Sequence, residues 1–440
     1  MSAANANYGL APAGLEPVVS RYFNLPDAWK IETVLKLGAY ETAKKALAGK
    51  PEDVLKVVMD SGLRGCGGAG FPTGKKWSFL PKDTKKPIYL VINADEGEPG
   101  TCKDRYILER DPHSLIEGII MSCYAIKSHK CYIYIRGEYV LPAARTQAAV
   151  DEAYAKGFLG DNVFGSGYRV DITVHRGAGA YICGEETALL NSLEGKRGLP
   201  RLKPPFPAVV GLFGCPTIIN NVETIASVMH IGRMGAENFV KWGGGAIGPH
   251  LYSVSGHVAK PGVYELPMGI TLRDIIYTHA GGVRGGKKIK AVIPGGMSAK
   301  ILRADEIDVK MDFDSLKAAG TMLGSSGVMV MDEDVCMVKA LLYACRFFAH
   351  ESCGQCSPCR EGTGWALKII ERIYRGEGRL EDLDTLLSVA GGMEGRTICV
   401  FAEAAAWPIQ SYIAKFRSEF EDYIKSGKSA GRDMAAAHAH

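Results

Sequence analysis

Three cysteines share one short loop near the C-terminal end of this chain. Cys353, Cys356 and Cys359 follow the spacing C-x₂-C-x₂-C, and Cys399 lies further along. Apolar residues recur at helical spacing before the loop, after it and again before Cys399. A bundle of helices can therefore return the fourth thiol to the first three. Four thiolates suit either an iron–sulfur cluster or a structural zinc ion.

The arrangement of the thiols distinguishes these two groups. Zinc in a Cys₄ site is usually bound by two separated C-x₂-C pairs. A consecutive triplet with one distant ligand is more common for a cubane cluster. Buried cysteines without any ligand are a third interpretation, to which the regular spacing gives little support. The sequence therefore predicts a 4Fe–4S cluster and a protein that transfers electrons.

Length and composition exclude several other classes of protein. The 440 residues leave room for two to four domains. A net charge of +4 is too small to indicate nucleic acid or a membrane surface as partner, and no apolar run approaches the ~20 residues needed to span a bilayer. No secretory signal is evident at the start, so we expect a reducing, cytosolic setting. We expect the remaining cysteines to be small core residues: Cys66, Cys102, Cys123, Cys131, Cys183, Cys215, Cys336 and Cys345.

The pattern of elements changes along the chain. A polar start leads into a predicted helix over residues 52–59. Strand-like runs then alternate with helical patterns, which predicts a mainly parallel sheet with helices on both faces and ligands at the carboxyl ends of its strands. The predicted strands cover residues 88–92, 131–135 and 170–174. One helix is predicted to begin at Asp111, and a second to cover residues 141–156.

The second half of the chain has a different pattern. The signal breaks around Trp242–Gly245, a plausible linker. Beyond it, strands surround one helix in a small β-grasp-like α+β module; they are predicted over residues 252–258, 263–266 and 291–293, with the helix over 271–279. From Val335 onward every pattern is helical. The tail after Lys425 has nothing to bury, and we expect it to be disordered.

A glycine-rich stretch precedes the first predicted strand. Gly65-x-Gly67-x-x-Gly70 matches the dinucleotide fingerprint, but that fingerprint needs a strand before it and a helix after it. Here a helix precedes the glycines, and no regular element is expected up to Trp77, so we reject an ordinary Rossmann phosphate turn. Bare backbone still allows N–H groups to approach a flat or charged ligand. Next to the glycines in the sequence, Lys75 and Lys76 offer cations for a phosphate, and Phe71, Trp77 and Phe79 offer rings for stacking. The alternative is a mobile surface loop.

Two further loops follow predicted strands. Asn93–Gly100 holds three carboxylates, which accept hydrogen bonds from polyol hydroxyls; such a loop is more often a solvated turn, but its place at a strand end favours a ligand site. In Gly177–Thr187, Glu185 and Glu186 occupy the positive end of the next helix. This favours ribose hydroxyls over a pyrophosphate there, and NADH over NADPH. Later, Arg201–Pro207 is stiffened by prolines, and a helix with polar caps begins after Asn220 and Asn221.

Together these stretches resemble the flavin- and NADH-binding subunit of respiratory complex I, the 51-kDa type known as the F subunit in bacteria. The likeness covers about residues 50–425 and includes the glycine loop, both acidic loops, Arg201–Pro207 and the cysteine loop with Thr397-Ile398-Cys399. It implies an α/β protein with a Rossmann-like domain, a ubiquitin-like β-grasp (SLBB-type) domain and a C-terminal helical bundle with the cluster. The expected division is 1–75 for the N-terminal segment with the glycine loop, 76–243, 244–334 and 335–440.

The resemblance also implies FMN, one 4Fe–4S cluster and NADH as substrate. Flavin contacts are expected from thirteen residues: Gly65, Gly67, Gly68, Lys76, Asn93, Asp95, Glu96, Tyr181, Gly184, Glu185, Asn220, Asn221 and Thr224. The NADH pocket is expected to be lined by Phe71, Phe79, Glu98, Glu186, Lys203 and Phe206. Glu98 is also expected to act catalytically, since a negative charge near the flavin lowers its potential. One departure stands out: Cys66 occupies the position where the family usually has arginine.

The implied function is NADH:quinone oxidoreductase activity: hydride transfer from NADH to FMN, then single-electron transfer to the cluster and on toward quinone. The implied partners are a thioredoxin-like 2Fe–2S subunit (E type) and the large iron–sulfur subunit of the peripheral arm (G type). The implied place is the inner face of the bacterial plasma membrane, as a peripheral cytoplasmic part of the complex. Two alternatives remain open at this stage: the diaphorase subunit of a soluble NAD-linked hydrogenase or formate dehydrogenase, and a non-catalytic zinc scaffold.

Overall fold

The computed structural model describes residues 8–12, 14–244 and 247–426. The chain forms two compact units. The first consists of Met1–Gly97, Thr101–Ser253 and Gly262–Ile270, and the second of Glu98–Gly100, Val254–Pro261 and Thr271–His440. In the described part of the chain, no helix has the length and apolar character required to cross a bilayer.

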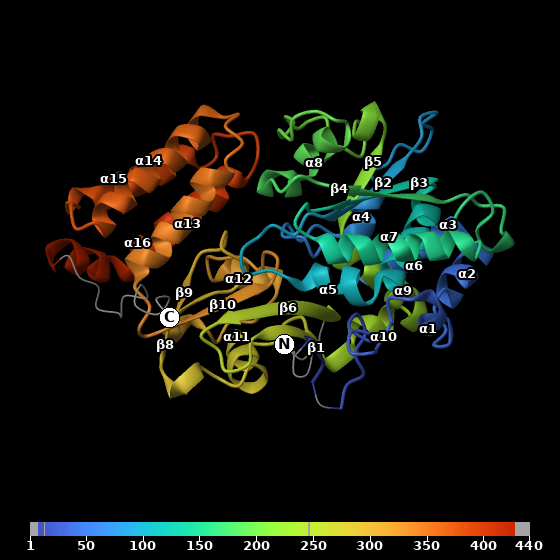
Figure 1. Ribbon diagram of the computed structural model, residues 1–440, viewed down its shortest axis with the longest axis horizontal. Helices are drawn as coiled ribbons and strands as arrows, with labels where there is room; N and C mark the ends of the chain where they lie inside the picture. Colours follow the sequence, from blue (N-terminus) through green and yellow to red (C-terminus); the bar gives the residue numbers. More distant parts are fainter. Residues whose placement is uncertain (1–7, 13, 245–246, 427–440) are drawn as a thin grey trace. The chain divides into compact units, whose positions relative to one another are not determined.

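A four-stranded sheet is the centre of the first unit (Figure 1). Its order is β4-β3-β2-β5, and each neighbouring pair is parallel. The prediction of a parallel sheet is therefore confirmed, although β5 was not foreseen. The strands are β2 (Tyr89–Ala94), β3 (Lys130–Ile135), β4 (Asp171–Arg176) and β5 (Thr217–Asn221).

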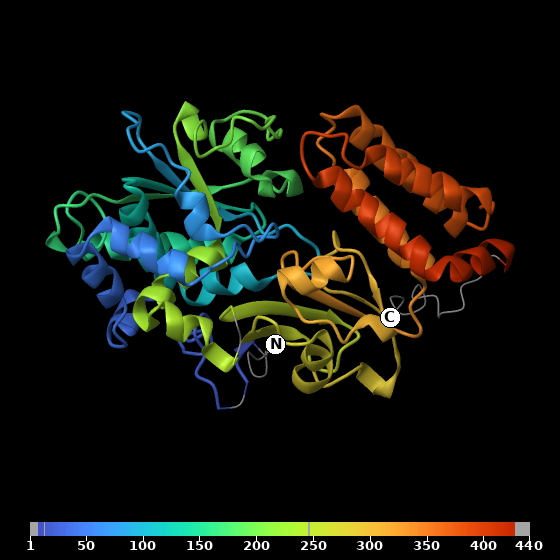
Figure 2. The same ribbon diagram turned by 180° about the vertical axis from the view of Figure 1, so that it is seen from behind.

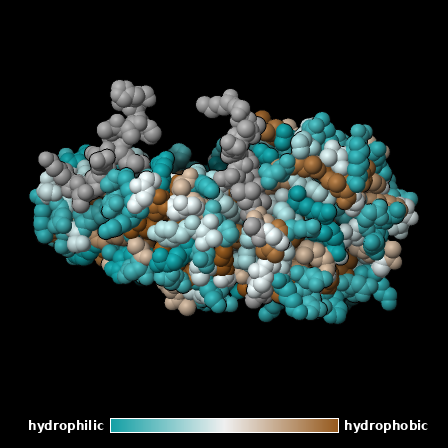
Figure 3. Space-filling model, turned by 90° about the horizontal axis from the view of Figure 1, so that it is seen from below, coloured by the Kyte–Doolittle hydropathy of each residue, from teal (hydrophilic) through white to brown (hydrophobic). Residues whose placement is uncertain are grey.

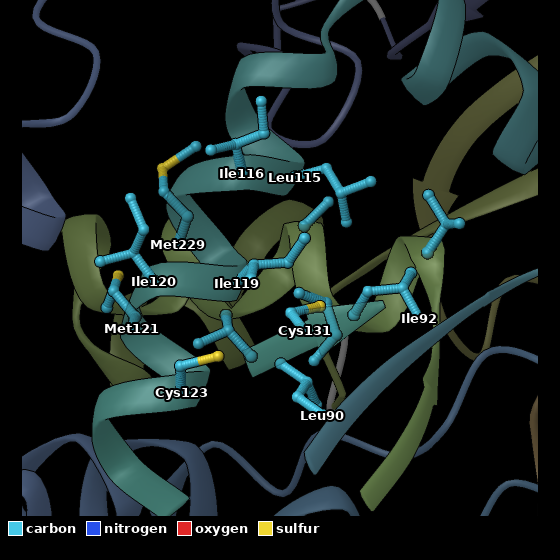
Figure 4. Packing of buried hydrophobic residues seen from close by; sticks show 14 of the residues in the cluster. Leu90, Ile92, Leu115, Ile116, Ile119, Ile120, Met121, Cys123, Cys131 and Met229 are labelled. Atoms are coloured by element: carbon cyan, nitrogen blue, oxygen red, sulfur yellow. The ribbon is translucent and has the colours of Figure 1, made fainter. Parts of the chain in front are cut away.

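Helix α6 (Pro112–Ile126) supplies much of the core beneath this sheet. It begins as the sequence predicts, because Asp111 caps it by accepting a hydrogen bond from the Ser114 backbone N–H and Pro112 occupies the first turn. Its apolar side chains gather around those of β2, β3 and α9 (Val222–Met234) (Figure 4). Burial of such side chains contributes about 1.5–3 kcal/mol each. The sheet is thus a rigid base for the loops at its carboxyl edge.

The sequence analysis did not predict several of the remaining helices of the first unit, and one of them contradicts it. The stretch to Trp77 was expected to lack regular structure, but its last five residues form α4. This short helix can pack closely because Gly74 leaves room for Met59; a Cβ added to Gly74 would lie 2.5 Å from Met59 Cγ. The helices are α1 (Ile31–Leu35), α2 (Glu41–Ala48), α3 (Pro51–Asp60), α4 (Thr73–Trp77), α5 (Lys103–Arg110), α7 (Val140–Ala155), α8 (Glu186–Leu193) and α10 (Ala236–Val240).

A second, mixed sheet has the order β1-β7-β6-β10-β8-β9. The predicted strands over 252–258, 263–266 and 291–293 correspond to β6, β7 and β8, while β1, β9 and β10 were missed. The predicted helix over 271–279 consists of α11 (Leu272–Asp274) and a π-helical turn, Ile275–His279. The strands are β1 (Tyr8–Leu10), β6 (Pro249–Gly256), β7 (Gly262–Pro267), β8 (Ile289–Ile293), β9 (Leu302–Arg303) and β10 (Gly327–Asp332), and α12 (Phe313–Ala318) joins β9 to β10.

The C-terminal part of the second unit is a four-helix bundle, as predicted (Figures 1 and 2). Helix α13 packs against α14 and α16, and α15 packs against the same two helices. The Phe348 and Phe401 rings meet edge to face at 5.7 Å between centroids. The helices are α13 (Met337–Glu351), α14 (Ser357–Tyr374), α15 (Glu381–Met393) and α16 (Phe401–Ser426).

Two smaller predictions concern the cysteines and the tail. Of the eight cysteines expected in the core, seven are buried and Cys102 is half-buried. The tail that the sequence predicts to be disordered lies, from residue 427 on, outside the described residues. On the face seen in Figure 3, hydrophilic residues cover most of the surface, with hydrophobic ones between them.

Candidate functional site

The glycine loop is anchored to the start of α9. The Cys66 backbone N–H donates to Thr224 Oγ1 at 2.9 Å. A Cβ added to Gly67 would lie 3.1 Å from the Asn221 Cβ, so glycine allows this close approach. The loop is closed on itself by the Gly65 backbone N–H, which donates to the Phe71 carbonyl at 2.9 Å. Its backbone is therefore held by the protein, which does not support the alternative of a mobile loop.

The first acidic loop meets the second at the end of β2. Asn93 donates through Nδ2 to the Gly184 carbonyl at 2.8 Å. A Cβ on Gly97 would lie 3.0 Å from the Tyr181 ring, and one on Gly184 would lie 3.3 Å from the Asp95 carbonyl oxygen. Both contacts require glycine or a shift of the neighbouring group. The two loops thus form one continuous surface of backbone.

The start of α8 carries a compact group of charges. Glu185 is the N-cap and accepts hydrogen bonds from the backbone N–H groups of Thr187 and Ala188 at 2.8 and 2.9 Å. Glu186 lies 2.7 Å from Lys203 Nζ and 3.1 Å from Lys76 Nζ. Burial alone would raise the pKa of Glu186, but the two ammonium groups outweigh burial and lower it. The carboxylate is therefore ionised and paired.

Lys76 links this group to β5. Besides Glu186, its ammonium donates to the Ile219 carbonyl at 2.8 Å. The next residues in the strand, Asn220 and Asn221, are also engaged: Asn220 Oδ1 accepts from the Trp77 indole N–H at 2.9 Å, and Asn221 caps α9. The structure thus brings the residues expected to contact flavin to one edge of the sheet. Their roles toward a cofactor stay predictions.

A buried network of charges lies beneath the glycine loop. Lys103 Nζ is 2.9 Å from Asp104 Oδ1 and 2.7 Å from Glu223 Oε2. His250 Nδ1 is 2.9 Å from the other oxygen of Glu223. Burial alone would raise the pKa of Glu223, but His250 and Lys103 outweigh it and hold the pKa at about 2. The sequence analysis missed this network, because only the fold brings its members together.

Cys66, the departure from the family pattern, points into this network. Its thiol, one Glu223 oxygen and the His250 imidazole lie within 4.8 Å of one another, and all three residues are buried. Burial raises the pKa of the Cys66 thiol far above its ordinary value, with the Glu223 charge adding to the effect. A thiol that stays protonated is a poor nucleophile and a poor redox group. Cys66 therefore has the character of a small buried core residue, as the sequence analysis expects.

Glu96 differs from the other carboxylates of its loop. It is buried and accepts hydrogen bonds from the backbone N–H groups of Asp104 and Arg105 at 2.9 and 3.1 Å and from the Tyr139 hydroxyl at 2.8 Å. Burial, together with the neighbouring Asp104 charge, raises the pKa of Glu96 to about 7. Through these hydrogen bonds, Glu96 fixes the acidic loop to the start of α5.

The residues expected to line the NADH pocket include three exposed aromatic rings. Phe71, Phe79 and Phe206 are 44%, 51% and 58% exposed, and the first two rings lie 5.9 Å apart between centroids. Exposed rings of this kind suit stacking on a planar ligand. Lys203 and Glu186 lie within the first unit, as described above. Glu98 belongs to the second unit, where its carboxylate accepts two hydrogen bonds from Ser298.

The cysteine loop lies between α13 and α14, and Cys399 precedes α16 by two residues. The Ile398 backbone N–H donates to Cys356 Sγ at 3.4 Å, so the segment with the fourth cysteine reaches the loop. Ser352 Oγ is 3.3 Å from Cys359 Sγ. Burial raises the pKa of the Cys359 thiol, and Cys353 and Cys356 add to it through their charge. All four thiols therefore come from one end of the bundle.

The spacing of these thiols tests the choice between zinc and a cluster. One zinc ion with four thiolates at ~2.3 Å holds its sulfur atoms about 4 Å apart. Among the residues that the structure describes, Cys66, Glu223 and His250 have ligand atoms within 4.8 Å of one another. No three of the described cysteines at the end of the bundle have sulfur atoms that close together. The donor set is all sulfur and more widely spaced than one zinc ion requires. It fits a larger group such as a 4Fe–4S cluster.

Family comparisons agree with this geometry. Residues 58–230 match a model described as the Nuo51 FMN-binding domain. Residues 250–335 match an SLBB domain, and residues 339–423 match the NADH-ubiquinone oxidoreductase-F iron-sulfur binding region. The chain is 53% identical to the F 2 subunit of NADH-quinone oxidoreductase of Rhizobium meliloti, over 93% of this chain and 98% of that protein. It belongs to the family of NADH-quinone oxidoreductase F subunits.

Other relatives of this family are nearly as similar. The F subunit of NADH-quinone oxidoreductase of Streptomyces coelicolor is 50% identical over 97% of this chain and 94% of its own length, and that of Mycobacterium tuberculosis is 51% identical over 94% of each. Among solved structures, an NAD⁺-reducing [NiFe]-hydrogenase in the H₂-reduced state superposes with a TM-score of 0.81 at 38% identity. That match covers 91% of this chain and 67% of the hydrogenase chain.

Proposed function

We propose that this chain is the NADH-oxidising subunit of an NADH:quinone oxidoreductase and that the edge of the first sheet is its flavin site. FMN and one 4Fe–4S cluster are its cofactors and NADH is its substrate. When bound, the flavin accepts a hydride from NADH and releases electrons singly to the cluster, on toward quinone. The observation that carries the proposal is the convergence of the glycine loop, both acidic loops and the α9 cap on one surface.

The residues at this surface fit a flavin nucleotide. Gly67, Gly97 and Gly184 let the loops pack on one another, since an added Cβ would lie between 3.0 and 3.3 Å from its protein neighbours. At Gly68 nothing lies within 4 Å of an added Cβ, so the backbone there leaves space for a flat ring or a phosphate to approach N–H groups. Lys76 supplies a cation, while Asn93 and Asn221 supply amide groups. We propose that the protein binds and orients the two ligands and excludes water, and that no side chain needs to abstract a proton.

The acids at the start of α8 support the choice of NADH over NADPH. The carboxylates of Glu185 and Glu186 would repel a 2′-phosphate on the adenosine ribose. The ion pairs with Lys203 and Lys76 fix the position of the Glu186 carboxylate. Phe71, Phe79 and Phe206 are the rings that would stack on adenine. Glu98 would act on the flavin through its charge.

The division into domains and the surroundings of the chain are part of the proposal. We place an N-terminal segment at 1–75, the flavin domain at 76–243, the SLBB-type domain at 244–334 and the cluster bundle at 335–440. A family whose relatives are named as one subunit implies further subunits. We propose a 2Fe–2S subunit of E type and the large iron–sulfur subunit of G type, with the complex at the inner face of the bacterial plasma membrane. Val400, which follows Cys399, and Trp365, on α14, are 74% and 54% exposed, which supports a protein partner on the bundle.

The hydrogenase diaphorase is the second candidate, because the solved hydrogenase chain has the same fold. Sequence identity favours the F subunit of NADH-quinone oxidoreductase, whose relatives are 50–54% identical, against 38% for the hydrogenase. The zinc scaffold is disfavoured by the spacing of the thiols and by the match to an FMN-binding domain.

The test is anaerobic purification with flavin, iron and sulfide quantified, followed by NADH–ferricyanide reduction with wild type, Lys76→Ala and Lys75→Ala. Lys75 is the matched control because it is an exposed neighbour on the same helix. We expect bound FMN and activity in wild type and in Lys75→Ala, with FMN retention falling about tenfold in Lys76→Ala, the loss of one charge-assisted contact. Zinc without iron or flavin would contradict the proposal, and an equal loss in both lysine variants would contradict the site.

A further inference from the structure

Glu98 is held by a loop that lies two hundred residues away in the sequence. The Ser298 backbone N–H donates to Glu98 Oε1 at 2.7 Å, and the Ser298 hydroxyl donates to Oε2 at 2.8 Å. One serine therefore engages both oxygens of the carboxylate. Two donors on two oxygens fix both the position of the group and its rotation.

The loop that carries Ser298 is itself rigid. It follows β8, and the Gly296 backbone N–H donates to the Gly327 carbonyl at the start of β10 at 2.8 Å. The Met297 backbone N–H donates to the Pro99 carbonyl at 3.1 Å, which fixes the residue after Glu98. Ser298 is buried. The end of the acidic loop is therefore bound through a side chain and through backbone.

Gly296 makes room for the Glu98 side chain. Its φ of +92° suits glycine, and an added Cβ would lie 2.5 Å from Glu98 Cγ. Glu98 thus fits into a space shaped by the loop after β8. A solvated turn, which is the ordinary state of an acidic loop, would need no such fit.

We propose that Ser298 is a positioning residue that sets the orientation of the Glu98 carboxylate and therefore the place of its charge. This rests on the proposed function, because it takes Glu98 to act on the flavin. The role of Ser298 is electrostatic, because it determines where a fixed negative charge lies.

The test compares Ser298→Ala, Ser298→Thr and Glu98→Gln in the holoenzyme, by redox titration of the flavin and by separate kcat and KM values for NADH. Glu98→Gln should raise the flavin midpoint potential, since it removes a negative charge. Ser298→Ala should raise it in the same direction by less and lower kcat/KM roughly tenfold, the effect of one lost hydrogen bond to a charged group. Ser298→Thr keeps the hydroxyl and should restore both values.

Two further variants separate positioning from general damage. Adding Ser298→Ala to Glu98→Gln should change neither quantity further, because the two residues act as one pair. Ser315→Ala is the matched control: that hydroxyl donates to Asp312 at 2.9 Å at the start of α12, in the same unit, and should leave the potential unchanged.

The outcomes distinguish this inference from the proposed function. If Glu98→Gln shifts the potential but Ser298→Ala leaves potential and KM as in wild type, the positioning role of Ser298 is overturned while the function stands. Effects of Ser298→Ala that threonine does not restore, or that persist on top of Glu98→Gln, also overturn it. A wild-type holoenzyme without flavin or without NADH oxidation overturns both.

Discussion

The candidate flavin site and the cysteine site are built in opposite ways. At the flavin site, segments from five parts of the chain bind one another through the protein's own contacts, such as Cys66 to Thr224, Asn93 to Gly184 and Lys76 to Glu186. At the cysteine site, one loop and one distant residue supply four thiols; Ser352 Oγ lies 3.3 Å from Cys359 Sγ, and the Ile398 backbone N–H donates to Cys356 Sγ at 3.4 Å. The first site is preorganised by the fold. The second depends more on the group that it binds.

Loss of one cluster cysteine gives the largest effect expected from this comparison. Cys356→Ser removes a ligand from a site with little other support, so iron and sulfide should fall close to zero. NADH–ferricyanide reduction should persist, because the flavin site belongs to the other unit. Iron analysis and the ferricyanide assay check this. A variant that keeps full iron, or that loses flavin together with iron, would break the comparison.

The buried charge network gives the next effect, at the flavin site. Lys103→Met leaves Asp104 and Glu223 buried without their cation, which costs about 3–5 kcal/mol. The loss should lower the unfolding temperature and release flavin on purification. Lys241→Met is the control, since its pair with Glu237 is exposed and should contribute little to stability. Equal stability of the two variants in denaturant titrations would show that the network does not support the site.

His230 is expected to make one contribution to the pH dependence of the first unit. Burial lowers the pKa of this histidine to about 3, with the charge of Arg233 adding to the effect, and neither ring nitrogen has a hydrogen-bond partner in the described part of the chain. The pKa of a histidine in the unfolded chain is about 6.5. Between that pH and about pH 3, the pKa in the folded protein, the unfolded chain binds more protons than the folded one. The free energy of unfolding therefore falls as the pH falls. At pH 5 the loss is about 2 kcal/mol.

A substitution separates this contribution from general acid sensitivity. His230→Phe should reduce the difference in unfolding free energy between pH 7.5 and pH 5 by about 2 kcal/mol, as measured by flavin release on denaturation. The exposed His129, replaced by phenylalanine in the same way, should leave the difference unchanged. If His230→Phe shows the same difference in unfolding free energy between pH 7.5 and pH 5 as wild type, His230 does not contribute to the pH dependence.

The smallest effect is expected at the cysteine site. Ser352 Oγ lies 3.3 Å from Cys359 Sγ, and a hydroxyl that donates to a cluster sulfur stabilises the reduced, more negative state. Ser352→Ala should therefore lower the cluster potential without loss of iron. Titration followed by electron paramagnetic resonance measures it, with Ser357→Ala as control, because the Ser357 hydroxyl accepts from Arg360 instead. An unchanged potential would assign Ser352 a packing role.

Local patterns in the sequence predicted the elements well. The helix after Asp111, the parallel strands and the helical C-terminal part all have short-range signals: a cap, β-branched runs and helical spacing. Thr73–Trp77 was the main local error, because adjacent glycines hide a short helix whose close packing on Met59 is a tertiary effect. Strand β5 was missed because its polar end, Asn220 and Asn221, reads as a helix cap.

The candidate site was predictable in its residues but not in its contacts. The motifs identified the loops, and their resemblance to a family assigned roles. The pairing of Glu186 with two lysines, the network at Lys103 and the hold of Ser298 on Glu98 join residues up to two hundred positions apart. No local pattern in the sequence predicts such pairs, because the fold alone decides which distant side chains meet.

The most direct test of the central claim is the response of the anaerobic holoenzyme to NADH, followed in one sample by flavin absorbance and by low-temperature electron paramagnetic resonance. The prediction is that the flavin absorbance bleaches and a cluster signal appears in wild type, while Cys356→Ser bleaches without the signal. An enzyme that carries both cofactors and stays oxidised with excess NADH, or a cluster signal that persists in Cys356→Ser, would contradict the account.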